Sequence, residues 1–254
     1  MRNYKITIEY DGSHFSGLQE QKHGTKTVYN TVEKALIKVF NGSLEELNFC
    51  GRTDAGVHAF GQVLNAKTLS SFVFPEGKLA LGLNYHLRGE HVSAVASSEV
   101  DMKFHARYSC LQRVYKYKIL NRSFKSPLYY NKAWLVPYKI DLLELEKIAQ
   151  IFIGTFDFSN FRNKDCSAKS PVRTVDFITI SKSNEGIIEI TIGAKSFLYN
   201  MVRSIIGAII DVVRGRISID KIKRQLQEPK KLITIKPQLA PSEGLYFMQA
   251  KYDD

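Results

Sequence analysis

Cysteine is scarce in this 254-residue chain, and its three copies do not form a pattern. Cys50, Cys110 and Cys166 are odd in number and far apart, which argues against a disulfide framework, and no C-x-x-C pair indicates zinc. The histidines are scattered too: His86 and His91 are five residues apart, so a metal role has little support. We therefore expect a reduced, cytoplasmic compartment and no metal.

Long apolar runs are also absent. The longest, residues 205–213, is interrupted by Asp211 and is far too short to span a bilayer. The opening Met1-Arg2-Asn3-Tyr4 leads directly into a strand pattern, so we expect no signal peptide. The sequence has neither a G-x-x-x-x-G-K-[ST] loop nor a dinucleotide-binding fingerprint, which argues against a nucleotide cofactor.

Acidic residues are outnumbered by basic ones, 25 to 36, which gives a formal net charge of +11. Such an excess favours a polyanionic partner, and nucleic acid is the first candidate. The alternative is that the basic charge only aids solubility. A hydrophobic share of 44% and only 7 prolines fit a globular chain, long enough for one large domain or two modest ones.

The first half of the chain alternates between strand and helix patterns. Residues 4–10 alternate like a strand, and residues 28–40 carry apolar side chains at helical spacing behind the plausible N-cap Thr27. A strand leading into Asp54, its partner around 62–66, a helix over 75–87 and a strand over 91–100 follow. The order β-α-β-β-α-β is that of a ferredoxin-like, or split βαβ, unit.

The second half repeats this theme. It shows a strand over 113–121, a helix over 142–153, a hairpin of 172–181 and 187–197, a helix over 199–213, a basic segment over 220–231 and a closing strand over 245–252. We therefore predict an α+β fold of two ferredoxin-like or RRM-like halves, with antiparallel sheets side by side and helices on one face. The halves are expected over 1–105 and 106–254, with an active-site cleft between them.

The stretch Gly51-Arg52-Thr53-Asp54-Ala55-Gly56-Val57-His58-Ala59 carries a carboxylate directly after an apolar strand pattern. If the strand continues to Asp54, period-two alternation places Arg52 and Asp54 on one face. The flanking glycines let the backbone turn sharply and approach another group. An acid paired with an arginine is ionised at neutral pH, so it suits a nucleophile or a base. The alternative is a solvent turn in which Asp54 caps its own backbone.

Two further patterns suit contact with a nucleobase. Tyr115 and Tyr117 are two residues apart on a strand with interleaved cations, so both face one side, where an aromatic ring can stack on a base. Core filling is the alternative for both. Arg203 lies off the apolar face of its helix, one turn before Gly207; the alternative is a surface arginine in a ladder with Asp211.

The nine residues around Asp54 resemble the signature of the TruA family of tRNA pseudouridine synthases, in which the aspartate of this motif is catalytic. Lys5-Ile6-Thr7-Ile8-Glu9-Tyr10-Asp11-Gly12 resembles the family's opening strand. The motifs around Tyr115 and Arg203 and the closing Glu243-Gly244-Leu245-Tyr246 are similar as well. The resemblance covers nearly the full chain in the same order.

This resemblance implies isomerisation of uridine to pseudouridine at positions 38, 39 and 40 in the anticodon stem-loop of tRNA, without cofactor, metal or ATP. It implies a homodimer that clamps tRNA. Asp54 would attack or deprotonate the ribose, and Arg52 would help to extrude the base. Arg203 would pair with Asp54, and Tyr115 would stack on the uracil. The expected further RNA contacts are His58, His105, Arg107 and Arg162.

Two other functions stay open at this point. One is a non-catalytic RNA-binding protein with paired RRM-like halves, and the other is an aspartate-dependent hydrolase. The sequence also departs from the family pattern at three positions. It has Leu18 where the family usually has tryptophan, Tyr29 where it has glutamine, and Val114 where a second arginine is frequent. These departures leave the chemistry intact, and they leave the details of RNA contact open.

Overall fold

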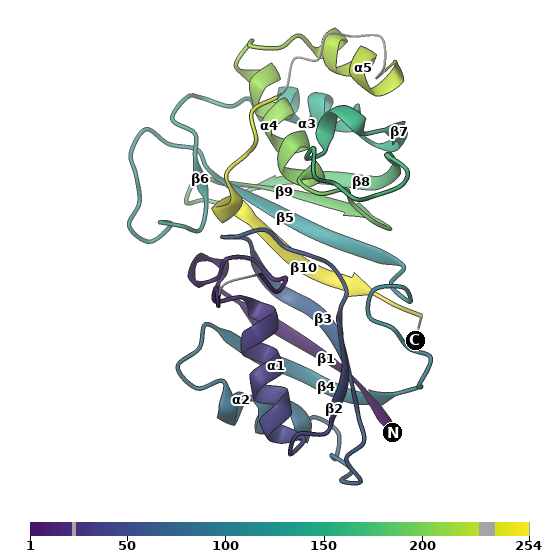
Figure 1. Cartoon of the computed structure of the whole chain (residues 1–254). Coiled ribbons are helices and arrows are strands. Elements are labelled where there is room, and N and C mark those ends of the chain that lie inside the picture. The colour runs from purple at the N-terminus through teal and green to yellow at the C-terminus, as the bar shows by residue number, and fades with distance from the viewer. Residues whose placement is uncertain (22–23, 229–236, 254) are drawn as a thin grey trace. The chain divides into compact units, whose positions relative to one another are not determined.

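The computed structural model describes residues 1–21, 24–228 and 237–253, and the chain divides into two units. Unit 1 comprises Met1–Leu111 and Tyr246–Asp254, and unit 2 comprises Gln112–Leu245. Each unit combines helices with a sheet, which confirms the predicted α+β class (Figure 1). The domain boundary at residues 105 and 106 stays a prediction.

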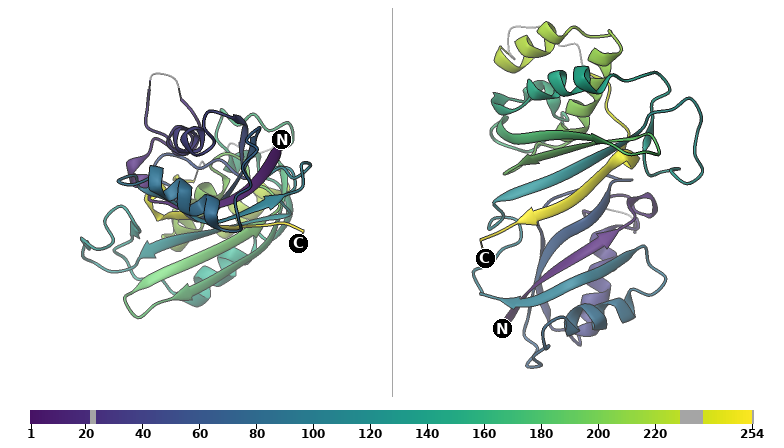
Figure 2. Two further views of the ribbon diagram at one scale, coloured as in Figure 1. Left: turned by 90° about the horizontal axis from the view of Figure 1, so that it is seen from below. Right: turned by 180° about the vertical axis from the view of Figure 1, so that it is seen from behind.

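Unit 1 has the element order predicted for its part of the chain. Its helices and strands are β1 (Arg2–Tyr10), α1 (Val28–Val39), β2 (Leu44–Phe49), β3 (His58–Thr68), α2 (Lys78–His86) and β4 (Val92–Val100), with the short 3-10 helix η1 (Gly12–His14) after β1. The antiparallel sheet has the order β4-β1-β3-β2, which is that of a ferredoxin-like unit. In Figure 1 and in both views of Figure 2, α1 and α2 lie on the same face of this sheet.

Helix α1 forms where the apolar spacing predicts it. Thr27 is its N-cap and accepts a hydrogen bond from the Asn30 backbone N–H at 3.2 Å. One face of the helix is buried, through Val28, Val32, Ala35 and Leu36. Complete burial of each large aliphatic side chain favours folding by about 1.5–3 kcal/mol, so this face anchors α1 to the unit.

Strand β3 is the central strand of unit 1. Antiparallel β1 lies along one edge, with Ile6 opposite Leu64. On the other edge, β2 pairs with the end of β3, and β10 (Leu245–Lys251) runs parallel to its start, with Tyr246 opposite His58. We expected this closing strand within the second half, because its sequence does not reveal which strand it pairs with. The start of β3 is thus held from both sides directly after the Asp54 motif.

Unit 2 is built around four antiparallel strands in the order β5-β9-β8-β7. Its elements are β5 (Gln112–Leu120), β6 (Trp134–Leu135), α3 (Leu142–Gln150), β7 (Gly154–Asp157), η2 (Ser159–Phe161), β8 (Val172–Lys182), β9 (Ile187–Ala194), α4 (Met201–Val213), α5 (Ile219–Gln227) and η3 (Ser242–Gly244). The hairpin β8–β9 is confirmed, and its turn contains Gly186 in the left-handed region, at φ +80°. Most of the predicted basic segment forms α5; residues 229–231 lie outside the described residues.

Helix α4 is buried on more sides than its apolar pattern predicts. From Met201 through Asp211, every residue except 203 and 204 is buried. The reason is residues 238–244, here called the strap, which cross the helix. A Cβ on Gly207 would lie 1.7 Å from the Gln238 carbonyl oxygen, so only glycine permits this crossing.

The three cysteines, all among the described residues, form no disulfide, and Cys50 and Cys110 are buried. Across residues 1–21, 24–228 and 237–253, no helix combines the length and the hydropathy that a bilayer crossing requires.

Candidate active site

Asp54 lies on a loop between β2 and β3. Because β2 ends at Phe49, the expectation that Arg52 and Asp54 share a strand face is wrong. Arg52 is exposed, Thr53 is buried and Asp54 is partly buried. The Val57 backbone N–H donates to the Asp54 carbonyl oxygen at 3.2 Å, and Gly56 between them adopts φ +81°. The loop therefore turns sharply just after the carboxylate.

Side chains from two neighbouring strands hold the start of this loop. The Gln62 amide, fully buried on β3, accepts from the Gly51 N–H at 3.3 Å and donates to the Gly51 carbonyl at 2.9 Å. The Tyr10 hydroxyl on β1 lies 2.7 Å from the Thr53 hydroxyl, and the Leu18 N–H donates to the Thr53 carbonyl at 3.0 Å. The backbone on the N-terminal side of Asp54 is thus fixed at two residues.

The segment that follows β1 packs closely on the same loop. A Cβ on Gly12 would lie 2.0 Å from the Val57 carbonyl oxygen, and one on Gly17 would lie 3.1 Å from the Thr53 carbonyl oxygen. Because Gly12 and Gly17 have no side chain, their backbone can lie directly against the backbone of the loop. The sequence predicted such a close approach at the glycines of the motif, and the structure shows it at Gly12 and Gly17.

His58 is buried at the end of the loop. Its Nδ1 accepts from the Gly12 N–H at 3.1 Å and lies 3.1 Å from Asp11 Oδ1, and its ring stacks on Tyr246 with centroids 4.7 Å apart. Only 2% of His58 is exposed. These contacts join the loop to η1 and β10; a contact of His58 with RNA stays a prediction.

The two tyrosines of β5 differ in their surroundings. Tyr117 is fully buried, and its hydroxyl donates to the Pro241 carbonyl at 2.8 Å. Burial, reinforced by Glu243, raises the pKa of Tyr117 well above its usual value, so this phenol stays neutral. Core filling therefore explains Tyr117. Tyr115 is 7% exposed and meets the edge of Phe197, with ring centroids 5.2 Å apart.

Arg203 is held by the strap. Its Nε donates to the Ala240 carbonyl at 2.8 Å, and the Ala240 N–H donates back to the Arg203 carbonyl at 3.2 Å. The alternative of a surface ladder with Asp211 is wrong, because Asp211 is buried. Its carboxylate accepts from the Gln238 N–H at 2.9 Å and lies 3.2 Å from Arg216.

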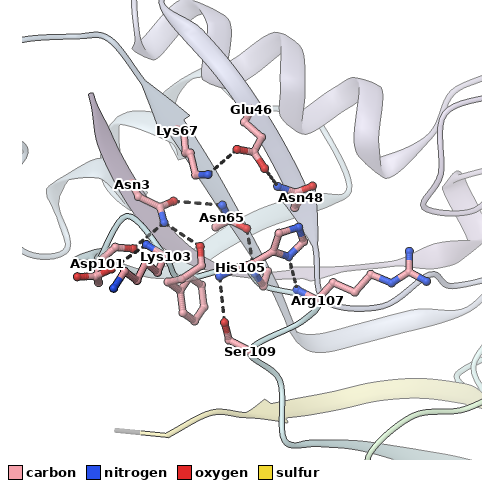
Figure 3. A network of polar contacts seen from close by, with 12 residues as sticks. Asn3, Glu46, Asn48, Asn65, Lys67, Asp101, Lys103, His105, Arg107 and Ser109 are labelled. Carbon is pink, nitrogen blue, oxygen red and sulfur yellow. Dashed lines mark hydrogen bonds and ion pairs between the residues drawn. The ribbon is translucent and has the colours of Figure 1, made fainter.

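A polar network fixes the segment that carries His105 and Arg107 (Figure 3). The Asn65 side chain donates to Asn3 at 3.1 Å and accepts from the Ala106 N–H at 2.9 Å, while Asn3 donates to the carbonyls of Asp101 and Phe104 at 2.9 Å. The imidazole of His105 accepts from the Arg107 N–H at 3.1 Å. Figure 3 shows the exposed Arg107 side chain extending away from the rest of this network.

Arg162 lies beside a cysteine that sequence reasoning did not single out. Its Nη1 donates to the Ala168 carbonyl at 3.5 Å. Burial opposes ionisation of the Cys166 thiol, but hydrogen bonds from the backbone of Ala168 and Tyr199, and the nearby charges of Arg162 and Arg173, lower its pKa on balance.

Two of the departures from the family pattern lie in the core. Leu18 and Val114 are buried, 3% and 5% exposed, so these substitutions act on packing inside the units. Tyr29 is half-buried against Phe49, with ring centroids 5.7 Å apart.

The predicted site residues thus fall into two sets. Unit 1 carries Asp54, Arg52 and His58 on one loop and its border, and His105 and Arg107 on another segment; unit 2 carries Tyr115, Arg203 and Arg162. Sequence reasoning missed Tyr10, Thr53 and Gln62 as the residues that hold the Asp54 loop. A buried glutamine within a strand pattern was the available signal, because a buried amide needs partners. Within the described ranges, no three His, Cys, Asp or Glu side chains are placed to hold a metal ion.

Comparisons with known proteins agree over almost the whole chain. A family model described as "tRNA pseudouridine synthase" matches residues 6–109 and 148–253. The chain is 40% identical over 252 residues to "tRNA pseudouridine synthase A" of Acetivibrio thermocellus, covering 99% of this chain and 100% of that protein. It is 42% identical to the protein of the same name from Thermoanaerobacter sp. strain X514, covering 99% and 100%.

Among solved structures, a chain of a Cbf5-Nop10-Gar1 complex matches with 13% identity and a TM-score of 0.39, covering 80% of this chain and 43% of that one. The sequence relatives share far more identical residues with this chain than that structure does, and they match it over their full length. The matched residues include the Asp54 motif of unit 1 and the Arg203 helix of unit 2. The chain therefore belongs to the tRNA pseudouridine synthase family.

Proposed function

We propose that the protein isomerises uridine to pseudouridine at positions 38, 39 and 40 in the anticodon stem-loop of tRNA, with Asp54 as the catalytic carboxylate. Family membership confirms the prediction of an isomerase that acts on tRNA uridine, and it leaves the non-catalytic alternative without support. The target positions and the roles of individual residues belong to the proposal.

The observation that carries the role of Asp54 is the set of hydrogen bonds around its loop. The residues at 51 and 53 are each held by hydrogen bonds, and the turn at Gly56 closes the other side. A carboxylate on such a loop stays in one position while a substrate is brought to it, which lowers the entropic cost of the reaction.

The proposed reaction is a rearrangement of bonds within one nucleotide. The C1′–N1 bond of uridine breaks, the uracil turns, and a C1′–C5 bond forms. The hydrogen on C5 leaves as a proton, and N1 takes up a proton, so the product is an isomer of the substrate. Nothing is oxidised or hydrolysed. Asp54 acts on the ribose as a nucleophile or a base, and its negative charge suits both roles.

Three other side chains complete the proposal. Arg52 is exposed beside Asp54 and helps to extrude the target base, a step that costs a few kcal/mol of unstacking. Tyr115 stacks on the uracil, and Arg203 supplies the counter-charge of Asp54; both roles rest on the resemblance of their motifs. His58, His105, Arg107 and Arg162 are proposed RNA contacts, of which Arg107 is the most exposed to solvent.

The proposed partners are tRNA and a second copy of the chain, in the cytoplasm. The net charge of +11 supports a large polyanionic ligand. If the protein binds phosphates, the logarithm of its association constant for tRNA should fall linearly with the logarithm of the salt concentration. The slope should be roughly −0.9 for each duplex phosphate neutralised. A filter-binding series from low to physiological salt measures this slope, and an unchanged affinity would remove the electrostatic argument for tRNA.

Tritium release tests the function. Purified protein is incubated with tRNA that carries tritium on C5 of uridine, with chelator and without cofactor. Formation of the C1′–C5 bond releases that tritium, and the absence of a methyl donor excludes release by methylation of C5. The wild-type protein should release it in proportion to the target uridines, and Asp54→Asn should fall to background. Asparagine keeps the shape but neither attacks carbon nor accepts a proton at neutral pH.

Two controls accompany Asp54→Asn. Its thermal melt should resemble that of the wild type, and its tRNA affinity should hold or rise slightly, because a negative charge beside the RNA is gone. A well-folded Asp54→Asn variant with normal turnover would remove Asp54 from the chemistry. Mapping the modified positions by mass spectrometry of tRNA fragments then tests the assignment to 38, 39 and 40.

A further inference from the structure

Tyr10, on β1, forms a side-chain hydrogen bond from outside the loop with the residue that precedes Asp54. Its hydroxyl lies 2.7 Å from the hydroxyl of Thr53, the residue before Asp54. Both side chains are buried, Tyr10 with 4% and Thr53 with 7% of its surface exposed. Water therefore does not replace this bond when it is broken.

The same tyrosine is linked to the other fixed point of the loop. Gln62, which holds both the N–H and the carbonyl of Gly51, also forms a side-chain hydrogen bond with Tyr10. Tyr10 thus joins the two residues, Gly51 and Thr53, whose positions determine where Arg52 and Asp54 project. A change at Tyr10 reaches the loop at both of these points.

The Tyr10 phenol keeps its proton at neutral pH. Burial raises the pKa of its phenol to about 12, although hydrogen bonds to Thr53 and Gln62 oppose the shift. The hydroxyl is therefore neutral across the physiological range, and its contribution is geometric.

We propose that Tyr10 is a positioning residue, which fixes the Asp54 carboxylate for attack on the ribose by holding Thr53 through the Tyr10–Thr53 hydroxyl pair. The inference rests on the proposed function and deepens it. It adds that the position of the Asp54 carboxylate depends on the Tyr10 hydroxyl, which contacts neither the substrate nor Asp54. Displacement of a reacting group by about 1 Å can cost about a hundredfold in rate.

The test is Tyr10→Phe, which removes one oxygen and keeps the ring in the core. The readout is the single-turnover rate of tritium release at saturating tRNA, together with the dissociation constant for tRNA. We expect the rate to fall at least tenfold while the dissociation constant changes less than twofold. A residue with only a structural role would lower the melting temperature and leave the rate unchanged at a temperature where the variant is folded.

Tyr4→Phe is the matched control. Tyr4 lies on the same strand and is 1% exposed, and its buried hydroxyl has no hydrogen-bond partner among the described residues. Removal of an unsatisfied hydroxyl is neutral or stabilising, so this variant should keep the wild-type rate.

Thr53→Val is the second variant, because it removes the other half of the pair with a side chain of the same shape. If the two hydroxyls act together, Tyr10→Phe, Thr53→Val and the double variant should be slowed by similar factors instead of multiplying. Multiplying effects, or a wild-type rate in folded Tyr10→Phe, would overturn the inference and leave the proposed function intact. A wild-type protein that releases no tritium would overturn both.

Discussion

The two units hold their proposed site residues by different means. In unit 1, Asp54 lies on an irregular loop whose shape comes from side chains elsewhere in the unit, above all Tyr10 and Gln62. In unit 2, Tyr115 lies within a strand and Arg203 within a helix, so regular backbone hydrogen bonds define their direction. The strap then adds a second constraint on Arg203 alone.

This difference determines how each unit responds to substitution. A loop held by a few side chains loses its shape when one of them changes, whereas a strand or helix keeps its direction through many equivalent bonds. We therefore expect distant substitutions in unit 1 to affect catalysis more than their effect on stability would indicate. In unit 2, the effect on activity should follow the contact that is removed.

Gly12→Ala should give the largest effect of the substitutions outside the motif. The new Cβ would lie 2.0 Å from the Val57 carbonyl oxygen, so the loop must move. We expect turnover to fall about a hundredfold and the protein to lose about 1–3 kcal/mol of stability. Gly82→Ala, within α2, is the control, because its Cβ would lie 4.0 Å from Cγ1 of Val39, an ordinary van der Waals distance; it should stabilise by about 0.5–1 kcal/mol. Normal turnover in Gly12→Ala would show that the loop tolerates displacement.

Tyr115→Leu tests the residue that unit 2 holds on a strand. Loss of stacking should weaken tRNA binding by about 1–3 kcal/mol, while Tyr115→Phe should bind nearly as the wild type does. Slower turnover in Tyr115→Phe would indicate that the hydroxyl handles a proton. A Tyr115→Leu variant that changes only the thermal melt would place Tyr115 with Tyr117 in the core.

Gly207→Ala tests how much the position of Arg203 in unit 2 depends on the strap. Its Cβ would meet the Gln238 carbonyl oxygen at 1.7 Å and move the strap away from Arg203. Because α4 keeps its own hydrogen bonds, we expect turnover to fall only about tenfold, with a clear loss in melting temperature. A larger loss in turnover than that of Gly12→Ala would reverse the proposed contrast between the units.

The smallest effect appears only in alkaline solution. The phenol of Tyr10 releases its proton near pH 10 when the chain is unfolded, but its folded pKa is about 12. Below pH 10 both states hold the proton, so this stabilising contribution is fully present there. Between pH 10 and 12 the unfolded state binds fewer protons, and stability falls by up to about 1.4 kcal/mol per pH unit. Denaturant melts of the wild type and Tyr10→Phe from pH 9 to 11 should show a shallower decline in the variant; equal slopes would contradict the burial of this phenol.

Much of the molecule follows from local sequence pattern. The spacing of Val28, Val32 and Leu36 predicts the buried face of α1, and Thr27 predicts its N-cap, because both depend on residues within one or two turns. The β-α-β-β-α-β order of unit 1 follows in the same way. The Asp54 motif and its resemblance to a family identify the chemistry, since a signature of nine residues is specific in a way that a single acid is not.

Tertiary structure decided what lies between these patterns. The sequence placed Asp54 at the end of a strand, but β2 stops at Phe49, and the position of the carboxylate depends on Tyr10 and Gln62, which are 44 and 8 residues away along the chain. It gave α4 one apolar face, but the strap buries the side near Gly207 as well. Hydrogen bonds and packing between distant segments have no periodicity to read, so only the folded chain reveals which partner each residue meets.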